Sequence, residues 1–573
     1  MAVLSSQLLT PAQPPPFIGE VCSPSIHTSL SRLNGTIPPL LKISRFSALP
    51  LVLVATWSLV LVAVNVIWIA NHRAPPTWDE AFNLIDALKL HRLLSAGDWY
   101  HFLDQYVNAF HNLEPPLIAL LPLPLYALVG PSFLIALLVV TLLIPLVNVF
   151  LYLLVRQLGR SRLEAVLSTV ILGTMPAVFG LSRQYFDDYP LTLVVIIWLY
   201  LLVKSDGYRK RWCNVLLGLF AGLALLLKAS FPLFVGVPAL AVLATRLRQA
   251  PHHIARDISV VVIIGFLVAG TWWAGNLSSA LSLALNAAFN ADFNDVHWNH
   301  SPYSPSAITA ALLGLANHGL SAFWALAAVA GLLLILVRPR MTTVHLRPTF
   351  LWFLGQWFIP ALLVGWILNV NRQPRYVLPA LPAVAVFIAA FLSTVTRRRP
   401  MQLVPVFVFP FLSYLYLSVA TLPVYNFNFG PFVLLAPRLG DTALRPNPTP
   451  WPMAQIVDFI ERDQWELNRS PAIVVVIADT PYFNPITFAY YAEARASFPV
   501  SGLPFGQPER LPEHVPDFLP YLVAKDGGYV GYSYYAPILQ GYVSQLRNDR
   551  SPYELLKSFP LPDGSRALVY RHL

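Results

Sequence analysis

Charged residues are scarce in this chain. Asp, Glu, Lys and Arg make up 12% of its 573 residues, whereas hydrophobic residues make up 56%. An ordinary soluble domain contains about 25% charged residues, so a chain with so few charges cannot cover a water-facing surface. The shortage of charge excludes an ordinary soluble protein and favours one that lies in a membrane.

Cysteine is also rare, since Cys22 and Cys213 are the only two. Two cysteines exclude a disulfide framework, and no CxxC or Cys/His cluster indicates structural zinc. The sequence also lacks an internal repeat of the kind that many transporters carry. These absences leave the apolar runs as the main guide to the fold.

Long apolar runs recur from about position 48 to position 422. Each has about 20 residues, which is enough to cross the hydrocarbon core as a helix. We therefore predict a polytopic α-helical membrane protein with about 11 transmembrane helices. The predicted spans lie roughly at 48–70, 132–155, 164–182, 189–204, 213–228, 231–246, 258–276, 320–337, 350–370, 376–394 and 401–422.

The net charge of +10 would suggest a nucleic-acid partner in a soluble protein. Here Lys and Arg gather in short loops that are two predicted spans apart, so these loops share one side. The positive-inside rule makes that side cytoplasmic, and the opposite loop at 277–306 has no Lys or Arg. We therefore exclude nucleic acid. The basic loops contain Arg156, Arg160 and Arg162; Lys204, Arg209, Lys210 and Arg211; Arg246, Arg248 and Arg256; Arg338, Arg340 and Arg347; and Arg397, Arg398 and Arg399.

The remaining segments complete the predicted domain organisation. Residues 1–46 are rich in Pro and Ser, which predicts a disordered cytoplasmic tail before the transmembrane part at 47–422. The first external loop, at 71–131, is expected to carry interfacial helices. Its segment 116–130 is apolar, but it is short and interrupted by prolines, so we place it at the outer surface and not across the membrane.

The composition changes after position 422. The run Ala472–Ala478 is typical of a buried strand, a turn follows at Asp479–Pro485, and a helix is expected to begin near Ile486. We predict a small extracytoplasmic α/β domain at 423–573. The whole chain is then a multi-pass protein of the cell membrane, with its N-terminus in the cytoplasm.

Two adjacent carboxylates, Asp79 and Glu80, stand just beyond the first predicted span, in the run Pro75–Glu80. Acidic residues also favour a helix start because of the helix dipole. A structural role and a catalytic role therefore both remain open for this pair.

Cations occur at three turns that face outward, against the positive-inside trend. A local ion pair or a snorkelling lysine explains any one of them, but three together are best explained by a bound anion. The planar fork of Arg suits a phosphate. The cations are Arg183 in the run Ser182–Leu191, which also contains Asp187 and Asp188; Lys228 in Leu225–Pro232; and Arg372 and Arg375 in Asn371–Pro379.

Carboxylates and cations on one outer face suit the transfer of a group from a phosphate-bearing lipid. A carboxylate can take the proton of an acceptor hydroxyl that attacks an anomeric carbon. Cations can stabilise the departing phosphate as its negative charge grows. The lipid tail explains why this chemistry lies at the membrane boundary.

These stretches resemble the membrane glycosyltransferases of the GT-C fold, in the group of the protein O-mannosyltransferases and the aminoarabinose transferase of lipid A. Asp79-Glu80 matches the Asp-Glu motif of the group's first external loop, and Arg183 through Leu191 matches its Arg-x-x-x-x-Asp-x-Pro-Leu motif. Lys228 is similar to a Lys-Gly-Pro element, although Ala229-Ser230 replaces the Gly. Arg372–Pro379 is similar to a basic Arg-Tyr-x-x-Pro segment, and the order of the motifs runs across about 48–394.

The resemblance implies a polyprenyl-phosphate sugar as donor, a lipid, glycan or protein as acceptor, and a single displacement that inverts the anomeric carbon. It makes Asp79 the general base, with Glu80 or Asp188 orienting the acceptor. It also places Arg183, Lys228, Arg372 and Arg375 at the phosphate end of the donor. Membrane lipids are the expected surroundings.

The sequence departs from this group before the paired prolines of the first loop, where Glu114 replaces a Lys that is expected to touch phosphate. Either other residues hold the phosphate, or the donor differs, or Glu114 binds a divalent metal. His297, His300 and His318 are further candidate ligands, although histidines in polar loops are usually solvated. No tight ligand spacing is present, so no cofactor is certain.

A multi-pass transporter of a lipid or small anion is the main alternative. It predicts ionisable residues near the bilayer midplane and broken helices in paired halves, whereas the charges here fall at the ends of the predicted helices. A non-catalytic scaffold leaves the outward charges without a role. A ligase that moves whole oligosaccharides remains open as a variant of the enzyme.

Overall fold

The structure is a computed structural model in which Pro50–Leu573 form one compact unit. The predicted tail at 1–46, the predicted loop residues 291–300 and the basic segments 338–345 and 397–400 lie outside the described residues. These described residues are 48–108, 114–249, 253–290, 301–337, 346–396, 401, 403–420, 427–435, 445–467, 471–502, 513–528, 536–548 and 551–573.

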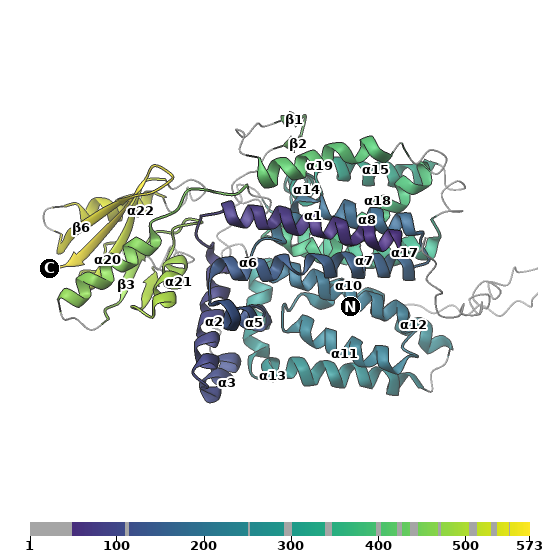
Figure 1. The fold of residues 1–573 in the computed structure, drawn as a ribbon, viewed down its shortest axis with the longest axis horizontal. Helices are drawn as coiled ribbons and strands as arrows, with labels where there is room; N and C mark the ends of the chain where they lie inside the picture. Colours follow the sequence, from purple (N-terminus) through teal and green to yellow (C-terminus); the bar gives the residue numbers. More distant parts are fainter. Residues whose placement is uncertain are drawn as a thin grey trace, which may run out of the picture. The chain divides into compact units, whose positions relative to one another are not determined.

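Apolar helices account for most of the chain as far as Val419 (Figure 1). The first are α1 (Leu49–Asn71), α2 (Trp78–Ser95), α3 (Trp99–Asn108), α4 (Leu117–Leu120), α5 (Leu123–Val129), α6 (Phe133–Thr141), α7 (Ile144–Gln157), α8 (Arg162–Gly173), α9 (Pro176–Leu181) and α10 (Asp188–Lys204). The next are α11 (Arg211–Leu225), α12 (Phe231–Gln249), α13 (Ile254–Phe289), α14 (Pro305–Gly314), η6 (Leu315–Leu320), α15 (Ala322–Val337), α17 (Pro348–Leu362), η7 (Leu363–Ile367), η8 (Pro374–Ala380), α18 (Leu381–Val395) and α19 (Leu403–Val419).

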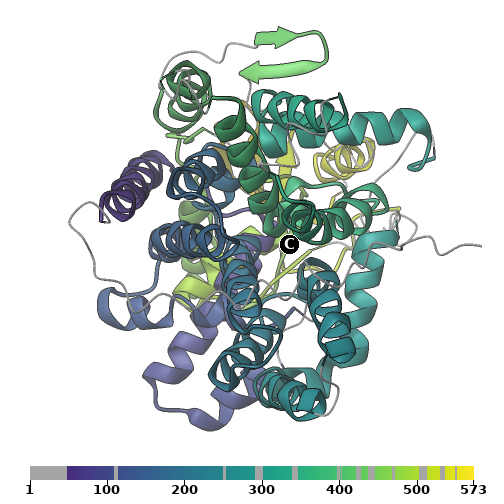
Figure 2. The same cartoon turned by 90° about the vertical axis from the view of Figure 1, so that its right-hand side faces the viewer.

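Every predicted span coincides with one or more of these helices. Among the described residues, 6 helical segments are long and apolar enough to cross a membrane, or 7 if the pair α14–η6 and α15, bent by 112°, counts as one. The membrane character of the chain is therefore confirmed, and 11 crossings stay a prediction that includes shorter helices such as α10 and α11. Figure 2 views many of the helices along their axes, so that their packing side by side is visible.

Helix α10 lies at the centre of the helical part. Its side chains are apolar on all sides from Tyr189 to Leu202, and nearly all of them are buried. A helix that is hydrophobic all round needs neighbours on every face, and α7, α11, α12 and η8 supply them. This packing fixes Asp188, the first residue of α10, in the protein interior.

Two glycines bring α11 close to α13. A Cβ added at Gly218 would lie 2.7 Å from the carbonyl oxygen of Val261, and one at Gly222 would lie 2.5 Å from the Cβ of Val268. Small residues four apart allow this approach of helix backbones in membranes. The close pair sets the position of Lys228, which follows α11.

The segment that was predicted to lie at the surface, 116–130, forms the short helices α4 and α5. Together they extend over Leu117–Val129, a length of about 20 Å as a continuous helix, which is less than the hydrocarbon thickness of about 30 Å. Both pack against α2. This agrees with a segment that does not cross the membrane.

The C-terminal part forms a five-stranded sheet in the order β4-β3-β5-β7-β6, preceded by a separate hairpin of β1 and β2. The predicted strand and helix are present as β3 and α21. The strands are β1 (Phe427–Phe429), β2 (Phe432–Leu435), β3 (Val474–Ile477), β4 (Val500–Gly502), β5 (Tyr521–Asp526), β6 (Tyr553–Pro560) and β7 (Arg566–His572), and the helices are α20 (Met453–Glu466), α21 (Pro485–Arg495) and α22 (Ala536–Leu546).

This sheet is covered by helices on both faces. Val474 and Val476 of β3 pack in one core with α20 and α21, whereas Val475 and Ile477 pack in a second core with α22. The alternation follows from the two-residue period of a strand. A sheet buried on both faces explains the continuous β-branched run that the sequence shows.

Candidate functional site

A cavity of about 330 Å³ lies where several helices begin. Its charged lining residues are Asp79, Glu114, Asp187, Lys228 and Arg375. One wall is apolar and comes mainly from the C-terminal half of α13, which contributes Ala280, Leu283, Ala284, Ala287, Ala288 and Phe289. The cavity therefore combines a charged floor with an apolar side.

Three of the charged groups lie at the N-terminal ends of helices. Asp79 lies in the first turn of α2, Asp187 just before α10, and Arg375 in the first turn of η8. At its other end, α10 finishes at Lys204, in a predicted cytoplasmic loop. The 17 residues of α10 span about 25 Å, so the cavity and the basic loops lie at opposite ends of the helices.

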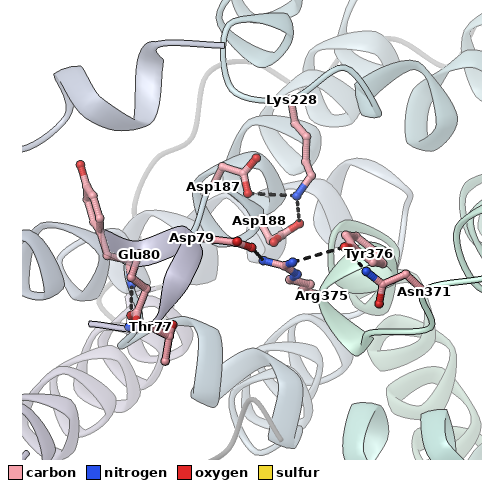
Figure 3. A network of polar contacts seen from close by, with 10 residues as sticks. Thr77, Asp79, Glu80, Asp187, Asp188, Lys228, Asn371, Arg375 and Tyr376 are labelled. Atoms are coloured by element: carbon pink, nitrogen blue, oxygen red, sulfur yellow. Dashed lines mark hydrogen bonds and ion pairs between the residues drawn. The ribbon is translucent and has the colours of Figure 1, made fainter. Parts of the chain in front are cut away.

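Asp79 and Arg375 form an ion pair, although 296 positions separate them in the sequence. The Arg375 Nη1 donates to the Asp79 Oδ2 at 2.6 Å, and its Nη2 donates to the Tyr376 hydroxyl at 3.2 Å (Figure 3). The guanidinium also lies over the ring of Phe186 at 5.0 Å. Arg375 is 13% exposed and Asp79 is 45% exposed, so the carboxylate remains accessible while the arginine holds it.

Lys228 forms the second ion pair of the cavity. Its Nζ donates to the Asp187 Oδ1 at 3.0 Å and to the Asp188 Oδ1 at 2.7 Å, as Figure 3 shows. The ammonium also lies 5.5 Å from the centre of the Tyr376 ring. The structure thus brings Asp79, Asp188, Lys228 and Arg375 close together, from α2, α10, the segment between α11 and α12, and η8.

Glu80 serves the backbone and does not line the cavity. Its Oε2 accepts from the backbone N–H and the hydroxyl of Thr77 at 3.1 and 2.8 Å, which completes a capping box. Its Oε1 accepts from the backbone N–H of Tyr185 at 3.0 Å. Burial raises the pKa of the Glu80 carboxyl. Glu80 therefore fixes the start of α2 to the segment that carries Asp187 and Asp188.

Glu114 reaches the same cavity from the segment between α3 and α4. The residue is open to the cavity, but protein surrounds it on the other sides. This desolvation, together with the charges of Asp187 and Asp79, raises the pKa of Glu114 to about 8, while Lys228 and Arg375 oppose the rise. A carboxyl with this pKa is mostly protonated at neutral pH, so it can donate a hydrogen bond.

Arg183 lies elsewhere. Its guanidinium is fully buried, donates to the Ser418 hydroxyl at 2.7 Å and lies over the ring of Trp68 at 4.8 Å. Arg183 is not among the described residues that line the cavity. This geometry therefore does not favour the predicted contact between Arg183 and a phosphate.

Arg372 also points away from the cavity. Its guanidinium donates to the carbonyl oxygens of Pro302, Ala307 and Ile367. These bonds tie the first turn of α14 and the segment before it to the end of η7. The geometry favours a structural role for Arg372 over the predicted phosphate contact.

A metal centre finds little support. No group of three or more His, Cys, Asp or Glu that could hold a metal occurs in the described part of the chain. His318 lies in η6, and His297 and His300 fall outside the described residues.

Sequence reasoning missed two residues of the site. Asp187 was read only as the neighbour of Asp188, and Tyr376 only as part of a motif, yet both line the cavity and contact its cations. The pairing of Asp187 with Asp188 in one motif was a usable signal. Nothing in the sequence places the Tyr376 ring beneath Lys228.

Comparison with family models finds a match in the helical part of the chain. Residues 113–273 match a family model described as dolichyl-phosphate-mannose-protein mannosyltransferase. No curated protein matches the chain. The matched region includes Glu114, Arg183, Asp188 and Lys228.

Solved structures are similar to the chain at low sequence identity. ArnT from Cupriavidus metallidurans bound to undecaprenyl phosphate is 16% identical, with a TM-score of 0.51, and the match covers 91% of this chain and 98% of that one. The same protein in the apo state is 16% identical, with a TM-score of 0.49 and coverages of 90% and 98%. The Archaeoglobus fulgidus oligosaccharyltransferase tethered to an acceptor peptide is 13% identical, with a TM-score of 0.47 and coverages of 82% and 69%.

The match to ArnT extends over nearly the full length of both chains, so it includes the helical part and the C-terminal sheet. The family match is independent evidence, because it depends on the sequence alone. The resemblance of this chain to the GT-C membrane glycosyltransferases, the group of the protein O-mannosyltransferases and ArnT, is therefore confirmed.

Proposed function

We propose that this protein transfers a sugar from a polyprenyl-phosphate donor to an acceptor at the extracytoplasmic face of the cell membrane. The observation that carries the proposal is the cavity in which the Asp79–Arg375 and Lys228–Asp188 pairs meet beside an apolar wall. The acceptor is a lipid, a glycan or a protein segment with a hydroxyl or a similar nucleophilic group.

The cations of the cavity suit the phosphate of the donor. Arg375 and Lys228 both have carboxylate partners, so they are held in place before a donor arrives, and fixed cations stabilise growing negative charge without reorganisation. The beginning of α10 adds a backbone dipole that favours an anion. The apolar wall of α13 suits the first isoprene units.

Asp79 is the general base of the proposed reaction. Its Oδ2 is held by Arg375, and its exposed side faces the cavity, where the acceptor hydroxyl would lie. The hydroxyl oxygen forms a bond to the anomeric carbon while the bond from that carbon to the phosphate oxygen breaks, and Asp79 takes the hydroxyl proton. This single displacement inverts the anomeric configuration and leaves a polyprenyl phosphate.

The orientation follows from the positive-inside rule. The cavity lies at the ends of helices opposite the loops that carry Arg156, Lys204 and Arg246. If those loops face the cytoplasm, the cavity and the C-terminal sheet lie outside it. The N-terminus is then cytoplasmic, and residues 423–573 form an extracytoplasmic domain.

The direct test uses the purified full-length chain in nanodiscs with radiolabelled polyprenyl-phosphate sugars. We expect label to pass to water or to an added membrane extract, with release of unlabelled polyprenyl phosphate. A protein that binds donors but never cleaves the sugar–phosphate bond would contradict the proposal. Uptake of intact label into sealed vesicles would then favour the transporter.

A further inference from the structure

The C-terminal part contacts the first external loop directly before Asp79 and again at the end of α2. The Trp78 Nε1 donates to the Asp479 Oδ1 at 2.6 Å, and the Thr487 hydroxyl donates to the Pro76 carbonyl at 3.0 Å. At the far end of the same helix, Arg92 forms an ion pair with Glu493 of α21. Helix α2 therefore packs along α21, and the contact includes the residue directly before the proposed base.

Three consecutive side chains at the start of α2 have three separate tasks. Successive side chains of a helix point about 100° apart, so Trp78, Asp79 and Glu80 face different directions. Trp78 binds Asp479, Asp79 faces the cavity, and Glu80 binds the backbone of Tyr185. The orientation of Asp79 is thus set by anchors on either side of it, one from the C-terminal sheet and one from the helical part.

Asp479 is presented by a rigid turn. Asp479 lies two residues after the end of β3. The turn that follows is closed by two backbone hydrogen bonds, because Thr480 and Phe483 each donate an N–H to the carbonyl of the other. Asn484 then caps α21, because its side chain accepts from the Thr487 N–H at 2.9 Å and donates to the Thr480 carbonyl at 3.1 Å. A side chain on such a support holds its partner more accurately than one on a loose loop.

A carboxylate is a costly group to use for simple adhesion between two parts of a protein, since its desolvation must be compensated. Apolar packing would serve adhesion equally well. The charge-assisted bond from an indole N–H is shorter and more directional. A carboxylate at position 479 is therefore explained by the need to orient a side chain, and the side chain that it orients is Trp78, the neighbour of Asp79.

We propose that Asp479 is a positioning residue, which holds the first turn of α2 through Trp78 so that Asp79 faces the donor cavity. This inference rests on the proposed function of Asp79. It gives the C-terminal sheet a part in catalysis, although no residue of the sheet lines the cavity among the described residues. Lys228 is held by Asp187 and Asp188, and Arg375 also bonds to the Tyr376 hydroxyl, so donor binding depends less on Asp479 than transfer does.

The test compares kcat and donor KM for Asp479→Ala, Asp479→Asn and Trp78→Phe. Loss of a directional bond to a charged group is expected to lower kcat about 10-fold in Asp479→Ala while donor KM changes less than about twofold. Asp479→Asn keeps an acceptor oxygen and should restore kcat to within about twofold of the wild type. The double variant Trp78→Phe/Asp479→Ala should be no slower than the slower single variant.

Asp458→Ala is the matched control, because Asp458 pairs with Arg495 between α20 and α21 and does not bond to α2. A fall in kcat for this control as large as that for Asp479→Ala would show a general loss of stability and overturn the proposal. So would an Asp479→Asn variant as slow as Asp479→Ala, or fully additive effects in the double variant.

Hydrogen exchange gives a readout that needs no activity. Amides in the first turns of α2 should exchange faster in Asp479→Ala than in the wild type, with no change in α10. Unchanged exchange in α2 would overturn the positioning role. If the wild type transfers no sugar but α2 loosens as expected, the proposed function fails while the structural link stands.

Discussion

Two arginines at the same end of the helices, Arg375 and Arg183, have different surroundings. Arg375 faces a cavity and holds a partly exposed carboxylate, Asp79. Arg183 is fully buried, bonds to Ser418 and lies between the rings of Trp68 and Phe179. A charge that meets a carboxylate in a cavity is available to a substrate, whereas a charge enclosed by rings and a hydroxyl serves the packing of helices.

The difference shows that a position at an outward turn does not by itself determine what surrounds an arginine. Both arginines stood out for the same reason, since each opposes the positive-inside trend. What separates them is the element against which each packs: η8 brings Arg375 to α2, whereas the turn after α9 brings Arg183 to the end of α19. Substitutions at the two positions should therefore change different properties.

The largest effect is expected at Arg375. Arg375→Ala removes a fixed cation and releases Asp79, and such a loss of transition-state stabilisation costs about 100- to 1000-fold in kcat/KM. Arg375→Lys keeps the charge but loses the planar fork, so we expect it to fall between the wild type and Arg375→Ala. Initial rates with labelled donor in nanodiscs measure both. An Arg375→Ala variant with wild-type kcat/KM would place the reaction elsewhere.

A smaller effect is expected from a change of pH, because it changes the charge of Glu114 in the cavity. Because the pKa of Glu114 is raised to about 8, Glu114 is neutral below that pH and negative above it. The charge faces Asp79 and Asp187 as well as Lys228 and Arg375, and it would repel a donor phosphate. Donor KM should therefore rise about 10-fold as the pH increases through this value, a change equal to about 1.4 kcal/mol.

The Glu114→Gln variant isolates this effect. The glutamine keeps a hydrogen-bond donor but cannot ionise. Its donor KM should therefore stay nearly constant between about pH 6.5 and about pH 9.5, a range that brackets the raised pKa of Glu114. Asp98→Asn, an exposed acid of the same loop that pairs with His101, is the control and should keep the wild-type profile. A Glu114→Gln variant with an unchanged alkaline rise would contradict this account of the cavity.

The smallest effect on activity is expected at Arg183. Arg183→Ala loses the bond to Ser418 and the contact with Trp68, which destabilises the fold by about 2 kcal/mol, while donor KM and kcat per folded molecule stay within about twofold of the wild type. Thermal unfolding of the detergent-solubilised protein and active-site titration measure the two quantities separately. A large rise in donor KM would instead show that Arg183 contributes to donor binding.

The sequence predicts the helical part well, because membrane helices are read from local apolar length and loop charge. It also predicts Asp79, Asp188, Lys228 and Arg375 as members of one outer face, since they end helices on the same side. It does not separate Arg183 and Arg372 from these four, because side-chain direction depends on packing between distant helices. The Trp78–Asp479 bond joins residues 401 positions apart, and no local sequence pattern predicts it.

The most direct test of the account is to measure donor binding and sugar transfer together in Asp79→Asn. The amide keeps the shape of the side chain and can still accept from Arg375, but it cannot take a proton. We predict donor affinity within about threefold of the wild type and at least about 100-fold slower transfer. Transfer at the wild-type rate by a folded Asp79→Asn protein would contradict the central claim, since the base would then be another group.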